Sequence, residues 1–430
     1  MLFKKITILD ENLCPRQNMF VGTTGDRIDY VGDAMPAEPS SYGEHYEGKG
    51  KLLMAGFVNS HAHSPMTLMR GYGENLALQD WLGSKIFPFE AKLRDEDVYN
   101  GTLLAMAESL RFGIVSTTDM YYFSEAMIRA IIESRTKNNL SRSITNFTGA
   151  DLWSMEGALE MKDLFEKYNG AEQDRIKVDM SLHAEYTSDP ATARSLADYT
   201  KAIGANMHVH VSETRFEHEA CKEKYGLTPT RYFAEQGILD TRTTAAHCVW
   251  IEGEDFDILK EKGVTVACNP VSNLKLASGV CNVPELLKRG VNVAIGTDSV
   301  ASNNSLNFIE EIKTFALVSK MYYGDPTAVT PLEALRAATL GGAIGQGRKD
   351  CGKLASGYKA DLIVLDIDQP HMNPVHNILN NIVYSASGSD VILTMVDGRV
   401  LYKDGCYTTI DIERAIYEAG KSTQRILSEL

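Results

Sequence analysis

Residues 55–63 read AGFVNSHAH, a short apolar run that leads directly into two histidines, His61 and His63. Residues i and i+2 of a β-strand point to the same side. If the apolar run forms a strand over Gly56–Ser60, both imidazoles can converge on one metal ion at its carboxyl end. Such a pair of histidines can also be structural. The rest of the sequence is needed to choose between a metal-binding and a structural role.

On the carboxyl side of this segment, short β-branched runs alternate with longer stretches of helical periodicity. Helical patterns such as Val98–Phe112 and Ser124–Asn138 separate the runs. Eight alternations of this kind predict an α/β fold, a (β/α)8 TIM barrel. The predicted strands are Gly56–Ser60, Ile114–Thr118, Ser143–Phe147, Lys177–His183, Met207–Val211, Thr243–His247, Val264–Cys268 and Val291–Thr297.

The two ends of the chain have a different pattern, with short strands and turns such as KKITILD (4–10) and DLIVLD (361–366). We expect them to pair into a small β-sandwich built from residues 1–54 and 355–430, with a helix over Ile410–Leu430. Residues 55–354 would then form the catalytic barrel. A chain of 430 residues suits one large barrel with a smaller module.

Charge and cysteine usage restrict the partners and the compartment. The formal net charge of −14 argues against nucleic-acid binding, which needs a basic surface. No apolar stretch approaches the ~18 residues of a membrane span, and the first residues lack the pattern of a signal peptide. The seven cysteines are scattered without a CxxC pair, so we expect no disulfide framework and a cytoplasmic location.

Three further histidines, His183, His210 and His247, fall at or near the ends of other predicted strands. In a TIM barrel these ends form the face that carries the active site. Each could be a structural histidine, but chance does not readily bring all of them to one face. His208 lies on the same strand face as His210, one layer deeper. We expect it either to pack in the core or to support the residues of the site. We expect structural roles for the remaining histidines, His45, His218, His371 and His376.

Two acidic residues complete the candidate site. Asp298 follows the eighth strand, where a carboxylate can bind a metal and accept a proton from water. It could equally cap a helix or a turn. Glu213 lies three residues after His210, where it is either a proton shuttle of the kind deaminases require or a solvated loop charge. Barrel hydrolases with two metals commonly bridge them with a carboxylated lysine ending the fourth strand, but His183 stands there, which favours one metal.

Taken together, these motifs resemble the amidohydrolase superfamily, in its branch of S-adenosylhomocysteine/5′-methylthioadenosine deaminases and related aminohydrolases. The resemblance covers nearly the whole chain and rests on the order of its segments. The segments are GFVNSHAHSPMTLMRGYGENLALQDWL (56–82), HVHVSET (208–214), TAAHC (244–248), NPVSNLKLASG (269–279), GTDSVASNNSLN (296–307), SGYKADLIVLD (356–366) and MVDGRVLYKDG (395–405).

The resemblance implies a role for each candidate residue. The implied metal ligands are His61, His63, His210 and Asp298, and the implied catalytic residues are Glu213 as proton shuttle, His247 as the residue that orients the nucleophilic water, and Asp298. The implied substrate contacts are Trp81, Glu90 (to the ribose hydroxyls), His183 (to the purine), Glu213 and Ser302. The implied cofactor is one divalent metal ion per chain, Zn²⁺ before Fe²⁺ or Mn²⁺.

The implied reaction is hydrolytic removal of the 6-amino group of an adenine nucleoside. 5′-Methylthioadenosine, adenosine, 5′-deoxyadenosine and S-adenosylhomocysteine are the candidate substrates, and the hypoxanthine analogue and ammonia are the products. One alternative is an aminohydrolase or chlorohydrolase of the same fold that acts on guanine, pterin, cytosine or triazine. Another is an inactive barrel that binds a metal or nucleoside, although it would not need Glu213. The protein could also form a homo-oligomer, and the sequence leaves this question open.

One feature departs from the family. Its members bind the homocysteine carboxylate with arginines near the third strand and the loop after it, but no arginine occurs from Ser143 to Asp174. Arg142 is expected at the start of the third strand, too early to reach the substrate. Binding a carboxylate without a cationic partner is costly. We therefore expect a preference for neutral 5′-substituted adenosines.

Overall fold

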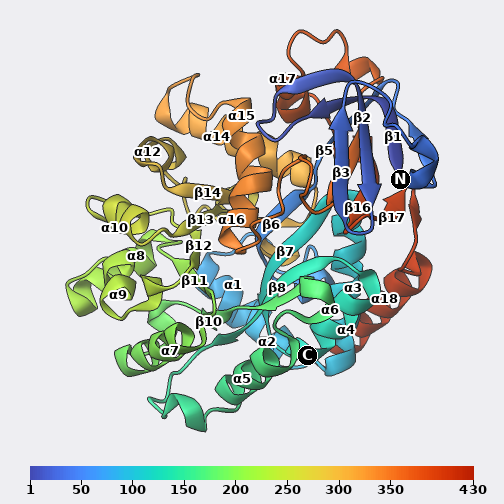
Figure 1. The fold of residues 1–430 in the computed structure, drawn as a ribbon. Helices are drawn as coiled ribbons and strands as arrows, with labels where there is room; N and C mark the ends of the chain where they lie inside the picture. Colours follow the sequence, from blue (N-terminus) through green and yellow to red (C-terminus); the bar gives the residue numbers. More distant parts are fainter.

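Eight parallel strand positions form the centre of the molecule and are surrounded by helices (Figure 1). The computed structural model describes all residues, 1–430. The barrel strands are β6 (Phe57–Ala62), β7 (Ile114–Tyr121), β8 (Lys137–Ile144), β9 (Ile176–Val178) with β10 (Met180–Leu182), β11 (Met207–Val211), β12 (Thr243–His247), β13 (Thr265–Cys268) and β14 (Asn292–Ile295). An isolated parallel bridge between Ala62 and Asp298 joins the last strand region to the first and closes the barrel. The predicted TIM barrel is confirmed.

Helices cover the outside of the barrel strands, which are buried almost throughout, as strands enclosed on both faces should be. Their apolar side chains belong to one large core that is shared with the helices. None of these helices combines the length and apolar composition needed to cross a membrane. The helices are α1 (Leu78–Trp81), α2 (Phe87–Glu90), α3 (Asp95–Arg111), α4 (Ser124–Ser134), α5 (Glu156–Tyr168), α6 (Ala171–Asp174), α7 (Pro190–Ile203), α8 (Arg215–Tyr225), α9 (Pro229–Glu235), α10 (Asp255–Glu261), α11 (Pro270–Lys275), α12 (Val283–Arg289), α13 (Val300–Asn303), α14 (Phe308–Tyr323), α15 (Pro331–Arg336), α16 (Gly342–Gly345), α17 (Ile378–Tyr384) and α18 (Ile412–Ser428).

Strands from both ends of the chain lie side by side at one flank of the barrel, where the blue and red segments meet in Figure 1. Hydrogen bonds join them into one sheet over a small apolar core of its own, and β5 pairs antiparallel with β15 at its centre. The pairing of the two termini is therefore confirmed, while the domain boundaries at residues 54 and 355 stay a prediction. The strands are β1 (Leu2–Leu9), β2 (Pro15–Thr24), β3 (Arg27–Gly32), β4 (His45–Glu47), β5 (Lys51–Ala55), β15 (Leu362–Asp366), β16 (Val391–Val396), β17 (Arg399–Lys403) and β18 (Cys406–Tyr407).

The third barrel strand differs from the prediction. It occupies Lys137–Ile144 instead of Ser143–Phe147, and the preceding helix ends at Ser134 because Arg135 takes the left-handed conformation (φ 62°). Arg142 accordingly lies near the carboxyl end of β8, so its expected position at the start of the strand was wrong. The first half of β8 is polar, and it pairs with β7 from Lys137 onward.

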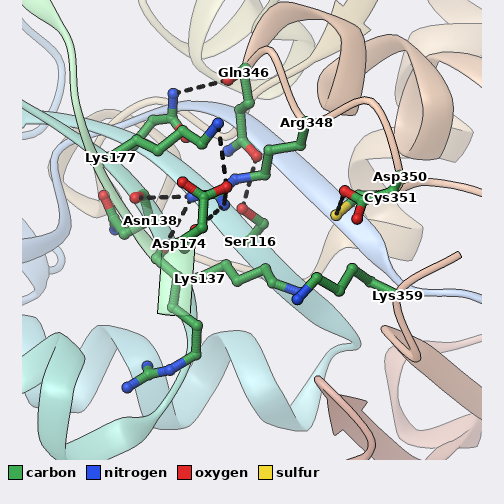
Figure 2. A network of polar contacts seen from close by, with 12 residues as sticks. Ser116, Lys137, Asn138, Asp174, Lys177, Gln346, Arg348, Asp350, Cys351 and Lys359 are labelled. Carbon is green, nitrogen blue, oxygen red and sulfur yellow. Dashed lines mark hydrogen bonds and ion pairs between the residues drawn. The ribbon is translucent and has the colours of Figure 1, made fainter. Parts of the chain in front are cut away.

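That polar half of β8 is buried at the amino-terminal end of the barrel, where partners from distant segments bond several of its polar groups (Figure 2). The Arg348 guanidinium donates to the carbonyl oxygens of Asn138 (3.2 Å) and Arg175 (2.9 Å). The hydroxyl of Ser116 donates to Gln346 Oε1 at 2.7 Å. Residues that follow the eighth strand therefore close the amino-terminal end of the barrel.

Lys137 links the barrel to the terminal module. Its side chain is 2% exposed and its ammonium donates to the carboxylates of Asp361 and Asp397, the latter at 2.6 Å. Burial alone would lower the pKa of Lys137, but the two carboxylates, Asp361 first, raise it, so the ammonium stays charged. The ion pairs offset the cost of burying these charges only while all members are present.

We expect Lys137→Met to reduce the free energy of unfolding by about 3–5 kcal/mol, because it leaves Asp361 and Asp397 without their buried cation. Denaturant unfolding of the variant and the wild type would measure the change. Lys349→Met, at an exposed lysine, is the control and should leave the midpoint unchanged. An unfolding midpoint of Lys137→Met equal to that of the wild type would contradict the linking role.

Candidate active site

The carboxyl ends of the barrel strands bring the predicted metal ligands together. His61 and His63 lie at the end of β6, His210 in β11, and Asp298 just after β14. The bridge that closes the barrel pairs Ala62 with Asp298, and the Asp298 N–H donates to the His61 carbonyl at 3.0 Å. Barrel closure therefore places the aspartate beside the two histidines of the first strand.

Two overlapping groups of potential metal ligands share His61. One consists of His61, His63 and Asp298, and the other of His61, His210 and His247, with the ligand atoms of each group within 4.8 Å of one another. Asp298 Oδ1 lies 3.5 Å from His61 Nε2 and 3.3 Å from His63 Nε2. His61 Nε2 is buried and has no hydrogen-bond partner. A buried ring nitrogen without a partner, aimed at a carboxylate among other imidazoles, fits a divalent metal ion.

Bonds outside the cluster orient each imidazole. The Nδ1 atoms of His63 and His210 contact the carbonyl oxygens of Met120 and His183, both at 2.7 Å. Because a carbonyl only accepts, these Nδ1 atoms carry the protons and both Nε2 atoms present lone pairs to the centre. His61 Nδ1 lies 2.9 Å from His208 Nε2, which gives His208 a supporting position. Such outer bonds fix the orientation and tautomer of metal-binding histidines.

Burial sets the protonation of this cluster. It lowers the pKa of His61 to about 3 and that of His210 well below its usual value, so both rings are neutral at pH 7. Burial alone would raise the pKa of Asp298, but contacts with His61 and His63 reverse this and hold it well below its usual value. Burial alone would also lower the pKa of His63, but Asp298 reverses this and raises it. Neutral His61 and His210 beside an ionised Asp298 are protonation states that bind divalent cations.

Glu213 follows β11 and is 7% exposed. Its Oε1 accepts a bond from the Ser278 hydroxyl at 3.4 Å, and its Oε2 lies 3.9 Å from His247 Nε2. Burial raises the pKa of Glu213 to about 7. A carboxyl group with a pKa near the ambient pH can both give and take a proton.

His247 ends β12 and is oriented by Asn273, whose Oδ1 lies 2.9 Å from His247 Nδ1. His247, Asp298 and Ser212 all adopt left-handed backbone conformations, with φ of 73°, 59° and 48°. Strained backbone of this kind costs roughly 1–3 kcal/mol per residue and concentrates at functional sites. The strained positions here follow or end barrel strands, where side chains must turn toward the axis.

A cavity of about 720 Å³, partly open to solvent, leads from the surface to this cluster. Trp81, Glu90, His183 and Ser302 line it together with Glu213, so the predicted substrate contacts share one space with the predicted ligands. One oxygen of Glu90, Oε1, accepts a bond from the Tyr121 hydroxyl at 2.7 Å. Burial raises the pKa of Glu90 to about 7. A lining of apolar and aromatic side chains with a few polar groups is typical of a small-molecule site.

Four side chains that support this site had no predicted role, or only a vague one. Asn273 orients His247, Tyr121 holds Glu90, and His208 holds His61. Ser272 donates to Asp298 Oδ2 at 2.5 Å, and Ser302 bonds the same oxygen at 3.1 Å. Ser272 and Asn273 belong to the conspicuous segment NPVSNLKLASG after β13, and its position at a strand end was the available signal.

Comparison with known proteins identifies the family of this chain. Residues 52–401 match the family described as the amidohydrolase family. A 5-methylthioadenosine/S-adenosylhomocysteine deaminase of Caldanaerobacter subterraneus is 38% identical over 99% of this chain and 98% of its own length. A 5′-deoxyadenosine deaminase of Methanosarcina mazei is 39% identical over 89% of this chain and 88% of its own length.

A solved structure shares the whole architecture. The adenosine deaminase from Xanthomonas campestris, crystallised with bound zinc, superposes with a TM-score of 0.93. It is 28% identical, and the match covers 99% of this chain and 98% of that protein. With a family match over most of the chain and relatives of similar length throughout, this protein belongs to the amidohydrolase family.

Proposed function

We propose that this protein is a metal-dependent hydrolytic deaminase that removes the 6-amino group of an adenine nucleoside. The observation that carries the proposal is the single cavity in which the histidine–aspartate cluster, Glu213 and Glu90 lie together. A metal site alone would serve many hydrolases. Glu213 beside the cluster adds a proton shuttle, and Glu90 adds an acceptor for sugar hydroxyls. The names of the relatives support the same reaction class.

His61, His63, His210 and Asp298 are the residues we assign to one divalent cation, with Zn²⁺ as the first choice. Fe²⁺ and Mn²⁺ suit the same nitrogen and oxygen ligands. When bound, such a cation lowers the pKa of water from ~15.7 toward ~7 and so supplies a nucleophile at neutral pH. Binding of a second cation by a bridging lysine is not supported, because His183 follows the fourth strand.

Protein side chains move the protons in this proposal. Asp298 takes a proton from the attacking water, while His247, held by Asn273, orients that water. Glu213 donates a proton to the ring nitrogen next to the attacked carbon, which makes that carbon more electrophilic. The oxygen–carbon bond forms, and the amino nitrogen takes the proton that Asp298 accepted. The bond from this carbon to that nitrogen then breaks, ammonia leaves, and the new hydroxyl group returns its proton to Glu213.

Ammonia release from a panel of compounds tests this function. The panel contains adenosine, 5′-methylthioadenosine, 5′-deoxyadenosine, S-adenosylhomocysteine, guanine and cytosine. Turnover of the adenine nucleosides above the free bases is the expected result. Turnover of guanine or cytosine alone would favour the free-base alternatives, and no turnover by metal-loaded protein would favour the inactive barrel.

Glu90→Ala is expected to lower kcat/KM for nucleosides more than for free bases. If the carboxylate accepts bonds from ribose hydroxyls, its loss should cost about 1.5–3 kcal/mol in transition-state binding. The measurement is kcat/KM for adenosine and for adenine, with the wild type and the variant assayed side by side. Equal losses on both compounds would contradict the ribose contact.

The site for the 5′ side of the substrate differs from that of the deaminases that this chain resembles. No lysine or arginine lines the cavity. Tyr122 lines the cavity, and the Arg142 guanidinium lies 4.8 Å from the centre of its ring. Arg142 Nε, however, donates to Glu160 Oε2 at 2.8 Å. Its charge is therefore already paired. We propose that neutral 5′ groups are preferred over the carboxylate-bearing homocysteine.

We expect kcat/KM for 5′-methylthioadenosine, 5′-deoxyadenosine or adenosine to exceed that for S-adenosylhomocysteine by about ten- to a hundredfold. An ion pair that the carboxylate lacks would be worth this much, about 1–3 kcal/mol. Glu160→Gln, which frees Arg142, should narrow the ratio, while Glu166→Gln on the exposed side of the same helix should not. A preference of the wild type for S-adenosylhomocysteine would mean that a cation reaches the carboxylate.

We also infer a cytoplasmic location, because all seven cysteines are free thiols. Reducing compartments keep thiols in this state, whereas secreted proteins commonly pair them. Ordinary fractionation of cells that express the protein would test the inference.

A further inference from the structure

Two buried carboxyl groups from different elements meet behind Glu213. Glu185 lies in the helical turn Glu185–Thr187 after β10 and is 1% exposed, while Glu217 lies in the first turn of α8 and is 3% exposed. The turn that carries Glu185 packs against α8, and the two carboxyl groups adjoin each other there. Neither has an ion pair with a lysine or arginine. The other titratable groups around the pair are Tyr186, Glu213, Cys221, Lys224, His247 and Cys248, of which Lys224 is exposed.

The surroundings of the two groups differ. Glu217 Oε2 accepts bonds from the backbone N–H groups of Glu213 at 2.8 Å and Thr214 at 3.3 Å. These donors stabilise an ionised carboxylate, as does its position at the amino end of a helix. Both oxygens of Glu185 and Oε1 of Glu217 are buried without a hydrogen-bond donor. A second buried negative charge there would be costly, so the shared proton belongs on Glu185.

We propose that Glu185 is a protonated carboxylic acid that donates a hydrogen bond to the Glu217 carboxylate, and that this pair positions Glu213 for proton transfer. Burial raises the pKa of Glu185 well above its usual value, and the neighbouring Glu217 raises it further. The proton would satisfy Glu217 Oε1, the oxygen that has no backbone donor.

The segment that the pair holds is strained. Ser212, directly before Glu213, has a φ of 48°, and its hydroxyl is 3.2 Å from His218 Nδ1 on α8. Glu217, which lies on the same helix as His218, accepts bonds from the N–H groups of Glu213 and Thr214, the two residues after Ser212. A bond that keeps the Glu217 carboxylate in place therefore also holds the Glu213 backbone, directly after the uncommon conformation at Ser212. Glu185 acts through Glu217 and does not touch the cavity, so we regard it as a positioning residue.

The positioning role rests on the proposed deaminase function, whereas the protonation of Glu185 does not. Two variants separate the need for a hydrogen-bond donor at position 185 from the need for a side chain of this size. Glu185→Gln keeps a donor, because its amide N–H can bond Glu217, and Glu185→Leu removes the donor at similar volume. We expect Glu185→Leu to lower kcat about ten- to a hundredfold with KM and metal content unchanged, since small displacements of a catalytic group have effects of this size. Glu185→Gln should keep kcat near the wild-type value.

Infrared spectroscopy tests the proton directly and needs no activity. The difference spectrum between wild type and Glu185→Gln at neutral pH should contain the C=O band of a protonated carboxylic acid, shifted by exchange into D2O. Absence of this band overturns the proposal even if Glu185→Leu fails to fold. Wild-type kcat in a folded Glu185→Leu also overturns it. If the wild type deaminates nothing, the proposed function and the positioning role fail together, while the infrared band still decides the protonation of Glu185.

Discussion

Glu213→Gln is expected to keep the bound metal and to lose about 10²–10⁴-fold in kcat, the usual contribution of a general acid–base group. The amide nearly matches the carboxyl group in shape and can still accept the 3.4 Å bond from Ser278. The amide cannot give a proton to the ring nitrogen of the substrate and recover one afterwards, as the proposed reaction requires. Steady-state kinetics on the best nucleoside, with metal analysis of the same preparation, would measure both effects.

Glu223→Gln provides the matched control, because it makes the same chemical change on the exposed side of α8. We expect this variant to behave as the wild type. If Glu213→Gln retained wild-type kcat, the assignment of Glu213 as the proton shuttle would be wrong. If it lost its metal, Glu213 would have a role in metal binding that we do not assign to it.

The barrel could be predicted where strands are apolar and buried on both faces. Met207–Val211 and Thr243–His247 were predicted to the residue, because apolar runs bounded by turn residues mark such strands. The third strand was misplaced because its first half contains Lys137, Asn138 and Asn139. All three are buried: Asp361 pairs with the Lys137 ammonium, and Arg348 donates to the backbone carbonyl of Asn138. Local sequence carries no sign of partners more than 200 residues away.

The site was predictable to the level of the side chains that face the metal position. His61, His63 and His210 show themselves through their place at strand ends, where a parallel barrel gathers its functional groups. What orients them was not predictable, because two of the three outer bonds go to backbone carbonyls on other strands. Every residue has a carbonyl, so residue type gives no signal for such a bond.

The same limit explains the position of Arg142. The strand begins six residues earlier than predicted, which moves this arginine from the expected start of the third strand to the face that carries the site. Its pairing with Glu160 then depends on α5, which follows the strand and packs against it. The sequence could thus indicate that a cation is scarce near the 5′ end of the substrate. It could not show that the nearest one is already paired.

Asp298→Ala and His61→Ala are expected to lose both the metal and the activity, unlike Glu213→Gln. The wild type should retain one equivalent of divalent metal after dialysis, measured by elemental analysis. Asp298 is the only carboxylate in the cluster and faces both His61 and His63, so its removal takes away the negative charge and one ligand together. Loss of an outer partner alone typically costs 10–100-fold in metal affinity, so loss of a direct ligand should cost more.

His371→Ala is the control for this prediction, because His371 lies in the terminal module and pairs with Asp390 at 2.7 Å. That variant should bind one equivalent and remain active. Addition of zinc to metal-free wild type should restore activity in proportion to occupancy up to one equivalent per chain. Two equivalents retained after dialysis would contradict the single-metal proposal. Full metal occupancy in Asp298→Ala would remove this aspartate from the ligand set and leave proton transfer as its role.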